Sequence, residues 1–127
     1  MSPAGVLGVG IDLVDVDRFR ASLARTPSMR ERMFTEGERA YAETANDPAE
    51  RYAARFAAKE AVMKAMGVGL GAFGFHDVEV LRAEGGQPWL RVIGAAELLA
   101  AERGVQAWQI SLTHTATSAG AVVVALG

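Results

Sequence analysis

The chain of 127 residues contains no cysteine, so it has neither a disulfide framework nor a thiolate metal site. It also lacks a basic excess: its formal net charge is −2, which argues against a general nucleic-acid-binding protein. No apolar run is long enough to span a membrane, and Asp12 interrupts the first one, so we interpret that run as a strand and not as a signal peptide. These absences favour a cytoplasmic protein that has no nucleic-acid or membrane partner.

Internal repeats, low-complexity tracts and long linkers are also absent, and we expect residues 1–127 to form one domain. A hydrophobic content of 50% is sufficient for a modest core. Four segments have the length and composition of strands, in two pairs joined by short turns: residues 75–82, 88–93, 105–113 and 118–126. Hairpins interleaved with helices predict the α+β class, with an antiparallel sheet packed on a long central helix.

A short helix that begins at a capping box of Thr35 and Glu38 is predicted through about residue 44, and the central helix is predicted over residues 46–67. Asp47 is expected to cap its first turn, with Glu50 completing a capping box, and Pro48 suits the first helical position because its missing N–H is not needed there. Gly67 supplies a left-handed stop. Apolar residues repeat at helical spacing and predict one stripe that faces the core: Tyr52, Phe56, Met63 and Met66.

Three charged residues of this helix carry the clearest chemical signal. Lys59 projects within the apolar stripe, where a lysine must either extend its ammonium group to water or meet an anion. Glu60 lies on the flank of the stripe and Lys64 follows one turn later, close enough for both to act on one ligand. The sequence permits two interpretations of Glu60 and Lys64, an exposed ion pair or a phosphate-and-metal site.

Residues 6–14 predict a buried strand whose only charge is Asp12. A buried carboxylate without a partner is costly, so Asp12 is expected either to cap the following helix or to bind a cation. That helix is predicted over residues 14–25. It begins a basic run, because five arginines and only one acid lie between Arg18 and Arg32. Such a run either forms a solvated surface or binds an acidic partner.

Two polar or flexible segments also have two interpretations each. Residues 68–74, directly after Gly67, form a glycine-rich connection that follows a helix, so it is not a P-loop, which precedes one. Its glycines either permit tight turns or allow the backbone to approach a ligand. His114 lies in a predicted polar turn over residues 113–117, where it either contacts a ligand or faces water.

Three segments together resemble one family, the bacterial holo-acyl-carrier-protein synthases, which are 4′-phosphopantetheinyl transferases. The segments are GVGIDLV at residues 8–14, RFAAKEAVMKA at residues 55–65 and SLTH at residues 111–114. The middle motif is specific, and the resemblance covers nearly the whole chain in order and at family length. It implies the same small α+β fold.

The resemblance implies transfer of phosphopantetheine from coenzyme A to a serine of acyl carrier protein, with release of adenosine 3′,5′-bisphosphate, in support of fatty acid or polyketide synthesis. It implies that Mg²⁺ is required and is bound by Asp12 and Glu60. The implied catalytic residues are Glu60, Lys64 and His114, with Glu60 or a water that it orients as the base. Coenzyme A is expected to contact a wider set: Lys59, Lys64, Gly67, Gly69, Gly71 and His114.

The resemblance further implies that Arg18 docks the carrier protein and that the protein is a homotrimer with active sites between subunits. The sequence itself adds that residues 121–126 are an unbroken apolar run, which one sheet face alone is not expected to cover. Two other functions would share these features. A different magnesium-dependent phosphoryl enzyme would not need the arginine run, and a non-catalytic binding module would use Asp12 as a cap and Glu60 in an ion pair.

Overall fold

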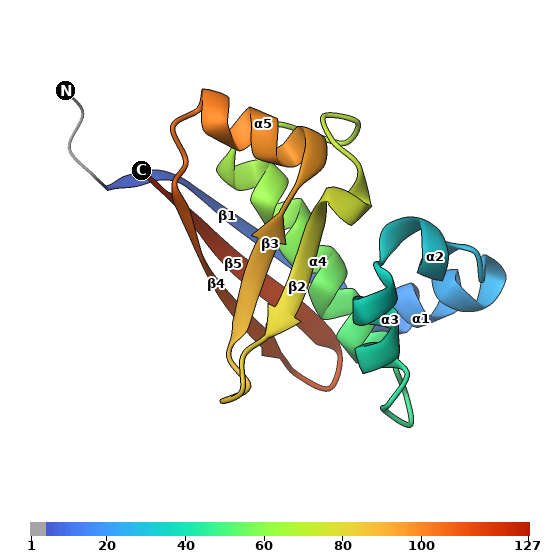
Figure 1. Cartoon of the computed structure of the whole chain (residues 1–127). Coiled ribbons are helices and arrows are strands. Elements are labelled where there is room, and N and C mark those ends of the chain that lie inside the picture. The colour runs from blue at the N-terminus through green and yellow to red at the C-terminus, as the bar shows by residue number, and fades with distance from the viewer. Residues whose placement is uncertain (1–4) are drawn as a thin grey trace.

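The computed structural model describes residues 5–127, with residues 1–4 outside the description. In chain order the elements are β1 (Val6–Asp15), α1 (Val16–Arg25), α2 (Met29–Met33), α3 (Glu36–Ala42), α4 (Ala49–Ala65), the 3₁₀ turn η1 (Phe75–Asp77), β2 (Val78–Arg82), β3 (Pro88–Val92), α5 (Gly94–Glu102), β4 (Ala107–His114) and β5 (Ser118–Leu126). Helix α4 runs through the middle of the molecule (Figure 1). The predicted α+β class with a long central helix is confirmed.

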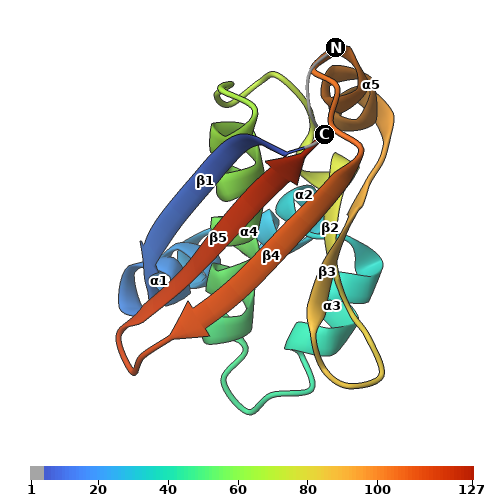
Figure 2. The ribbon, with the colours of Figure 1, turned by 90° about the vertical axis from the view of Figure 1, so that its left-hand side faces the viewer.

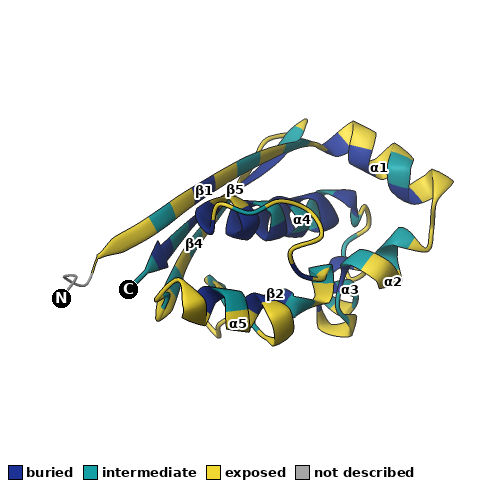
Figure 3. Ribbon diagram, turned by 90° about the horizontal axis from the view of Figure 1, so that it is seen from above, coloured by how far each residue is buried: buried dark blue, intermediate teal, exposed yellow. Residues whose placement is uncertain are grey.

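The main sheet has three antiparallel strands in the order β1-β5-β4, so the chain's last strand lies at the centre (Figure 2). Its register places Asp12 opposite Ala121, and His114 opposite Ala119. One face of this sheet packs on α4. The hairpin of β2 and β3, together with α5, covers another side of the helix (Figure 3). Both predicted hairpins are confirmed.

Strand β1 approaches α4 at backbone distance because two of its inward positions are glycine. A Cβ atom on Gly8 would lie 1.9 Å from the carbonyl oxygen of Ala65, and one on Gly10 would lie 1.8 Å from that of Ala61. Contacts this short are impossible for real atoms, so any side chain at either position would force the strand and helix apart. The glycine-rich start of the chain therefore serves strand–helix packing.

Helix α4 is buried around most of its circumference. Many of its buried residues are alanine, whose small side chain lets the neighbouring elements pack close to the helix. Its beginning differs from the prediction. The first helical residue is Ala49, Pro48 occupies the cap position, and no side chain caps the helix through the expected box. Asp47 accepts a hydrogen bond from the amide of Ala49 at 3.3 Å, but its carboxylate also binds Arg20 of α1. Gly67 has a φ of 70°, as the predicted left-handed stop requires.

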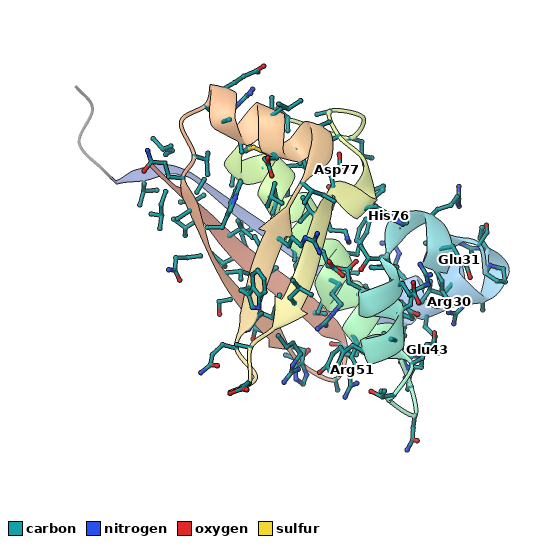
Figure 4. The ribbon with its side chains drawn as sticks, in the orientation of Figure 1. Arg30, Glu31, Glu43, Arg51, His76 and Asp77 are labelled. Atoms are coloured by element: carbon teal, nitrogen blue, oxygen red, sulfur yellow. The ribbon has the colours of Figure 1, made fainter. Side chains whose placement is uncertain are left out.

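The helices before α4 pack together in a second, smaller hydrophobic cluster. Asp15 caps α1 by accepting from the amide of Arg18 at 2.9 Å, and Thr35 forms with Glu38 the capping box predicted at the start of α3. The short helix α2 was not predicted, and neither was η1, which replaces the beginning of the strand expected from residue 75. His76 of η1 contacts the carbonyl oxygen of Glu31 at 2.6 Å and so holds α2 against η1 (Figure 4).

The sheet face that points away from α4 is apolar and exposed along β1 (Figure 3). Val9, Ile11 and Leu13, here called the outer β1 face, are 58%, 64% and 70% exposed. The prediction that one sheet face alone would not cover residues 121–126 is confirmed, because Ala121, Val123 and Ala125 are buried, whereas Val122 is exposed and Val124 and Leu126 are half-buried. Within residues 5–127, no helix combines the length and the hydropathy that crossing a bilayer demands.

Candidate active site

A cavity of about 350 Å³ lies where β1, α1 and α4 meet. Asp12 reaches it from β1, Arg18 from α1, and Phe56 and Glu60 from α4. The strand and helix are held together by the glycine contacts described above, which bring the two carboxylates toward one another. The structure thus unites three of the residues that the sequence singled out, Asp12, Glu60 and Arg18, although they are far apart along the chain.

Asp12 lies at an inward position of β1, and its side chain is only 19% exposed. It does not cap α1, because Asp15 does. Its partner is instead Lys64, in the last turn of α4, whose Nζ lies 3.1 Å from Asp12 Oδ1 and also donates to the carbonyl oxygen of Ile11 at 2.9 Å. Lys64 therefore pairs with Asp12 and not, as the simpler interpretation expected, with Glu60.

Glu60 faces the same cavity one turn before Lys64. Burial raises the pKa of Glu60 above its ordinary value, the nearby Asp12 carboxylate raises it further, and the Lys64 ammonium partly opposes both effects. Two carboxylates in this position repel one another when both are ionised. A cation bound between the two carboxylates would therefore relieve this repulsion.

The donor set suits magnesium better than metals that need more protein ligands. In the described part of the chain, histidine and acidic side chains nowhere gather in threes or more around a possible ion position. Mg²⁺ commonly takes only one or two carboxylates and completes its shell with water and phosphate oxygens. Asp12 and Glu60 supply such a pair, and both are oxygen donors, so the residues present fit this ion.

Lys59 occupies a different environment from the one predicted. Its side chain is fully buried and its Nζ donates to Glu38 Oε1 at 2.8 Å, to the carbonyl oxygen of Phe75 at 2.8 Å and to that of Val78. A lysine ammonium has three N–H donors, and all three are used. Of the two alternatives for this lysine, contact with water or with an anion, the structure shows an anion, which is Glu38. The contact of Lys59 with coenzyme A is therefore corrected to an internal role in the fold.

His114 lies apart from the carboxylates. It lines a second cavity, of about 680 Å³, and its Nδ1 is 3.2 Å from Glu50 Oε1 at the start of α4. Asp12 and Glu60 do not line this cavity. Within one chain, the structure therefore does not bring His114 to the predicted metal site, and Glu50 serves as its partner instead of completing a capping box.

The second cavity contains a group of arginines that the sequence analysis did not assign. The guanidinium carbons of Arg51, Arg55 and Arg82 lie 4.1, 4.5 and 4.8 Å from the ring centre of Tyr41. Arg55 is only 4% exposed, and its buried Nε has no hydrogen-bond partner within residues 5–127. Burial lowers the pKa of the Arg55 guanidinium from its ordinary value. Arg51 and Arg55 lie four residues apart on one helix, and this spacing was the only feature of the sequence that could have indicated a basic group here. Tyr41 and Arg82 are brought to them only by the fold.

The predicted glycine loop follows Lys64. Gly67 lines a third cavity, of about 470 Å³, together with Lys64 and Arg103. Gly71 has a φ of 95°, a conformation that favours glycine. Gly69 and Gly71 do not line that cavity. A Cβ atom at any of the three glycines would meet no atom within 4 Å, so the tight packing seen at β1 is absent from this loop.

The basic run is only partly neutralised by neighbouring acids. Arg20 binds Asp17 and Asp47, and Arg30 binds Glu43 at 3.1 Å (Figure 4). Arg18 is exposed beside the first cavity and forms no ion pair within residues 5–127. The surface of α1 near the carboxylates therefore retains an available positive charge.

Comparison with known proteins gives concordant results. The profile of the 4′-phosphopantetheinyl transferase superfamily matches residues 8–124. A holo-[acyl-carrier-protein] synthase of Frankia casuarinae is 52% identical over 120 residues, which cover 94% of this chain and 97% of the relative. The crystal structure of the synthase from Neisseria meningitidis matches with a TM-score of 0.87 at 28% identity, over 95% of this chain and 98% of that one. The Helicobacter pylori enzyme in complex with coenzyme A matches with a TM-score of 0.81 at 28% identity, over 92% and 98%.

Proposed function

Because this chain belongs to the 4′-phosphopantetheinyl transferase superfamily, we propose a mechanism centred on Asp12, Glu60 and Lys64. The chain acts as a holo-acyl-carrier-protein synthase: it transfers 4′-phosphopantetheine from coenzyme A to a serine of apo acyl carrier protein. The serine oxygen forms a bond to the phosphopantetheine phosphorus, the bond from that phosphorus to the bridging oxygen breaks, and adenosine 3′,5′-bisphosphate leaves. The observation that carries the mechanism is the convergence of two carboxylates and a lysine on one small region.

Asp12 and Glu60 would hold Mg²⁺. The bound ion would supply charge neutralisation for the pyrophosphate, which is a main source of catalysis in phosphoryl transfer. The two side chains come from different elements, one from β1 and one from α4, and both elements are fixed by close backbone packing. The carboxylates are therefore positioned before any ligand arrives.

Lys64 is proposed to bind a phosphate oxygen of coenzyme A. Its side chain is 53% exposed and its Nζ uses two of its three donors on Ile11 and Asp12, so it is accessible to an anion. Glu60, or a water that it orients, is proposed to accept the serine proton, because its carboxylate lines the cavity beside Arg18, where the carrier protein is proposed to dock.

Arg18 is proposed to dock the carrier protein. It stands on α1 beside the carboxylate cavity and has no acidic partner in the described chain. A partner with an acidic helix would be oriented by this charge, with its serine directed toward the cavity. We propose that the reaction supplies carrier protein for fatty acid or polyketide synthesis in the cytoplasm, and that the whole chain works as one domain.

A homotrimer with sites between subunits is proposed on two structural grounds. The outer β1 face is apolar and exposed, which is typical of a surface that another copy covers. His114 and the arginines around Tyr41 lie in a different cavity from Asp12 and Glu60, so a site that uses both groups needs two chains. Coenzyme A would then meet Gly67, Gly69 and Gly71 beside Lys64, with His114 contributed by the neighbour.

Mass spectrometry of apo acyl carrier protein tests the activity directly. After incubation with this protein, coenzyme A and Mg²⁺, the carrier protein should gain one phosphopantetheine group per molecule. The Glu102→Ala variant removes an exposed carboxylate from α5, outside the proposed site. It is the control for removal of a site carboxylate and should retain the activity. An unmodified carrier protein under conditions where the folded enzyme binds coenzyme A would contradict the assignment.

A further inference from the structure

Within residues 5–127, the cationic group that contacts Asp12 is the Lys64 ammonium. Its Nζ lies 3.1 Å from Asp12 Oδ1 and 2.9 Å from the carbonyl oxygen of Ile11, so it is held by two groups of β1 at once. Asp12 has no other side-chain hydrogen bond within residues 5–127, and Glu60 does not pair with the lysine. One of the two site carboxylates is therefore paired with a lysine of the same chain.

We propose that Lys64 alternates between two partners, holding Asp12 in the metal-free protein and moving to an anionic phosphate once a divalent cation binds Asp12 and Glu60. The inference deepens the proposed function and rests on it, because it concerns the same site. The cation and the phosphate ligand then favour one another: the cation releases the lysine, and the phosphate gives it a new partner. Lys64 couples the two binding events.

The expected effects are small and have a definite sign. Lys64 is half exposed, and an exposed ion pair changes an equilibrium by about two- to five-fold. Without coenzyme A, Lys64→Met should therefore tighten binding of a divalent cation by about that factor, since the cation no longer displaces an ammonium group. Without divalent cation, Asp12→Ala should tighten coenzyme A by a similar factor, because Lys64 is free in advance.

Removing any charge near the site changes the affinities for the divalent cation and for coenzyme A through long-range electrostatics, so matched controls are needed. Arg18 lines the same cavity as Asp12 but does not hydrogen-bond to it, and Arg18→Met removes an equal charge. Glu60→Ala removes the other site carboxylate, which has no ion pair with Lys64 in the structure. Direct contact predicts a larger effect for Lys64→Met than for Arg18→Met, and for Asp12→Ala than for Glu60→Ala.

The experiment measures Mn²⁺ binding by the paramagnetic resonance signal of free Mn²⁺, and coenzyme A binding by calorimetry in EDTA, on the full chain. Tighter Mn²⁺ binding by Lys64→Met, beyond that of Arg18→Met, and tighter coenzyme A binding by Asp12→Ala, beyond that of Glu60→Ala, would support the inference. If wild type binds Mn²⁺ and either specific variant only equals its control, the coupling is refuted while the metal site stands. If wild type binds no Mn²⁺, the proposed metal site fails and the coupling with it.

Discussion

Replacing Lys59 with methionine tests whether this lysine serves the fold or the ligand. The substitution removes the ammonium group from a fully buried position and keeps an unbranched side chain there. The Glu38 carboxylate would remain buried, with only the amides of Thr35 and Val80 as donors, at 2.9 Å each. Removing one partner of a buried ion pair costs about 3–5 kcal/mol, because the other charge is left uncompensated. Domains of this kind have a total stability of about 5–15 kcal/mol, so the loss should be large.

Urea unfolding followed by circular dichroism, at one fixed protein concentration, measures this loss. Lys64→Met is the control, because the Lys64 ion pair is half exposed and its removal should change the free energy of unfolding by about 0–1 kcal/mol. Coenzyme A affinity in the presence of Mg²⁺ should show the opposite order. The folded Lys59→Met variant should bind normally, whereas Lys64→Met should weaken binding by about 10- to 100-fold, the value of a charge-assisted hydrogen bond. A stable Lys59→Met variant with weak coenzyme A binding would refute the internal role.

Asp12→Ala and Glu60→Ala should each abolish transfer across a magnesium titration and leave the circular dichroism spectrum unchanged; near-normal turnover in either would remove the metal assignment. Arg18→Glu should raise the apparent KM for carrier protein with little effect on coenzyme A, and added salt should reduce its difference from wild type. Equal KM values at low salt would place the docking surface elsewhere. Asp12→Asn should lower the pKa of Glu60 in the metal-free protein, because one cause of its elevation is the Asp12 charge, and a carbon-detected NMR titration measures this. A mixture of Arg18→Glu and Glu60→Ala chains should regain activity after subunit exchange if sites form between subunits, whereas light scattering from a monomer would contradict the trimer.

Local patterns predicted the elements whose causes are local. The apolar run of β1, the capping box at Thr35 and the stop at Gly67 each depend on residues only a few positions apart. The α+β class followed from the two hairpins. Helix α2 was missed because five residues are too few to establish a helical period.

Errors arose where a distant residue decided the outcome. Asp47 does not form the expected capping box because Arg20, 27 positions earlier, binds its carboxylate. Lys59 is internal because the fold places Glu38 beside it, 21 positions away. Asp12 and Glu60 were paired through resemblance, and no spacing in the sequence would have paired them. Long-range partners of charged residues are thus the information that one sequence did not supply.

The glycine contacts of β1 also govern the tolerance of the active site to change. Asp12 follows Gly10 by two residues, and Glu60 immediately precedes Ala61, whose carbonyl oxygen Gly10 faces. The distance between the two carboxylates is therefore set by the packing of the β1 backbone on the α4 backbone, and not by how the core side chains pack. Repacking of the core elsewhere should leave metal affinity nearly constant, whereas a single added methyl group at Gly10 would widen the span. For protein engineering, this makes the site robust to most core redesign, whereas Gly8 and Gly10 are positions that cannot be altered.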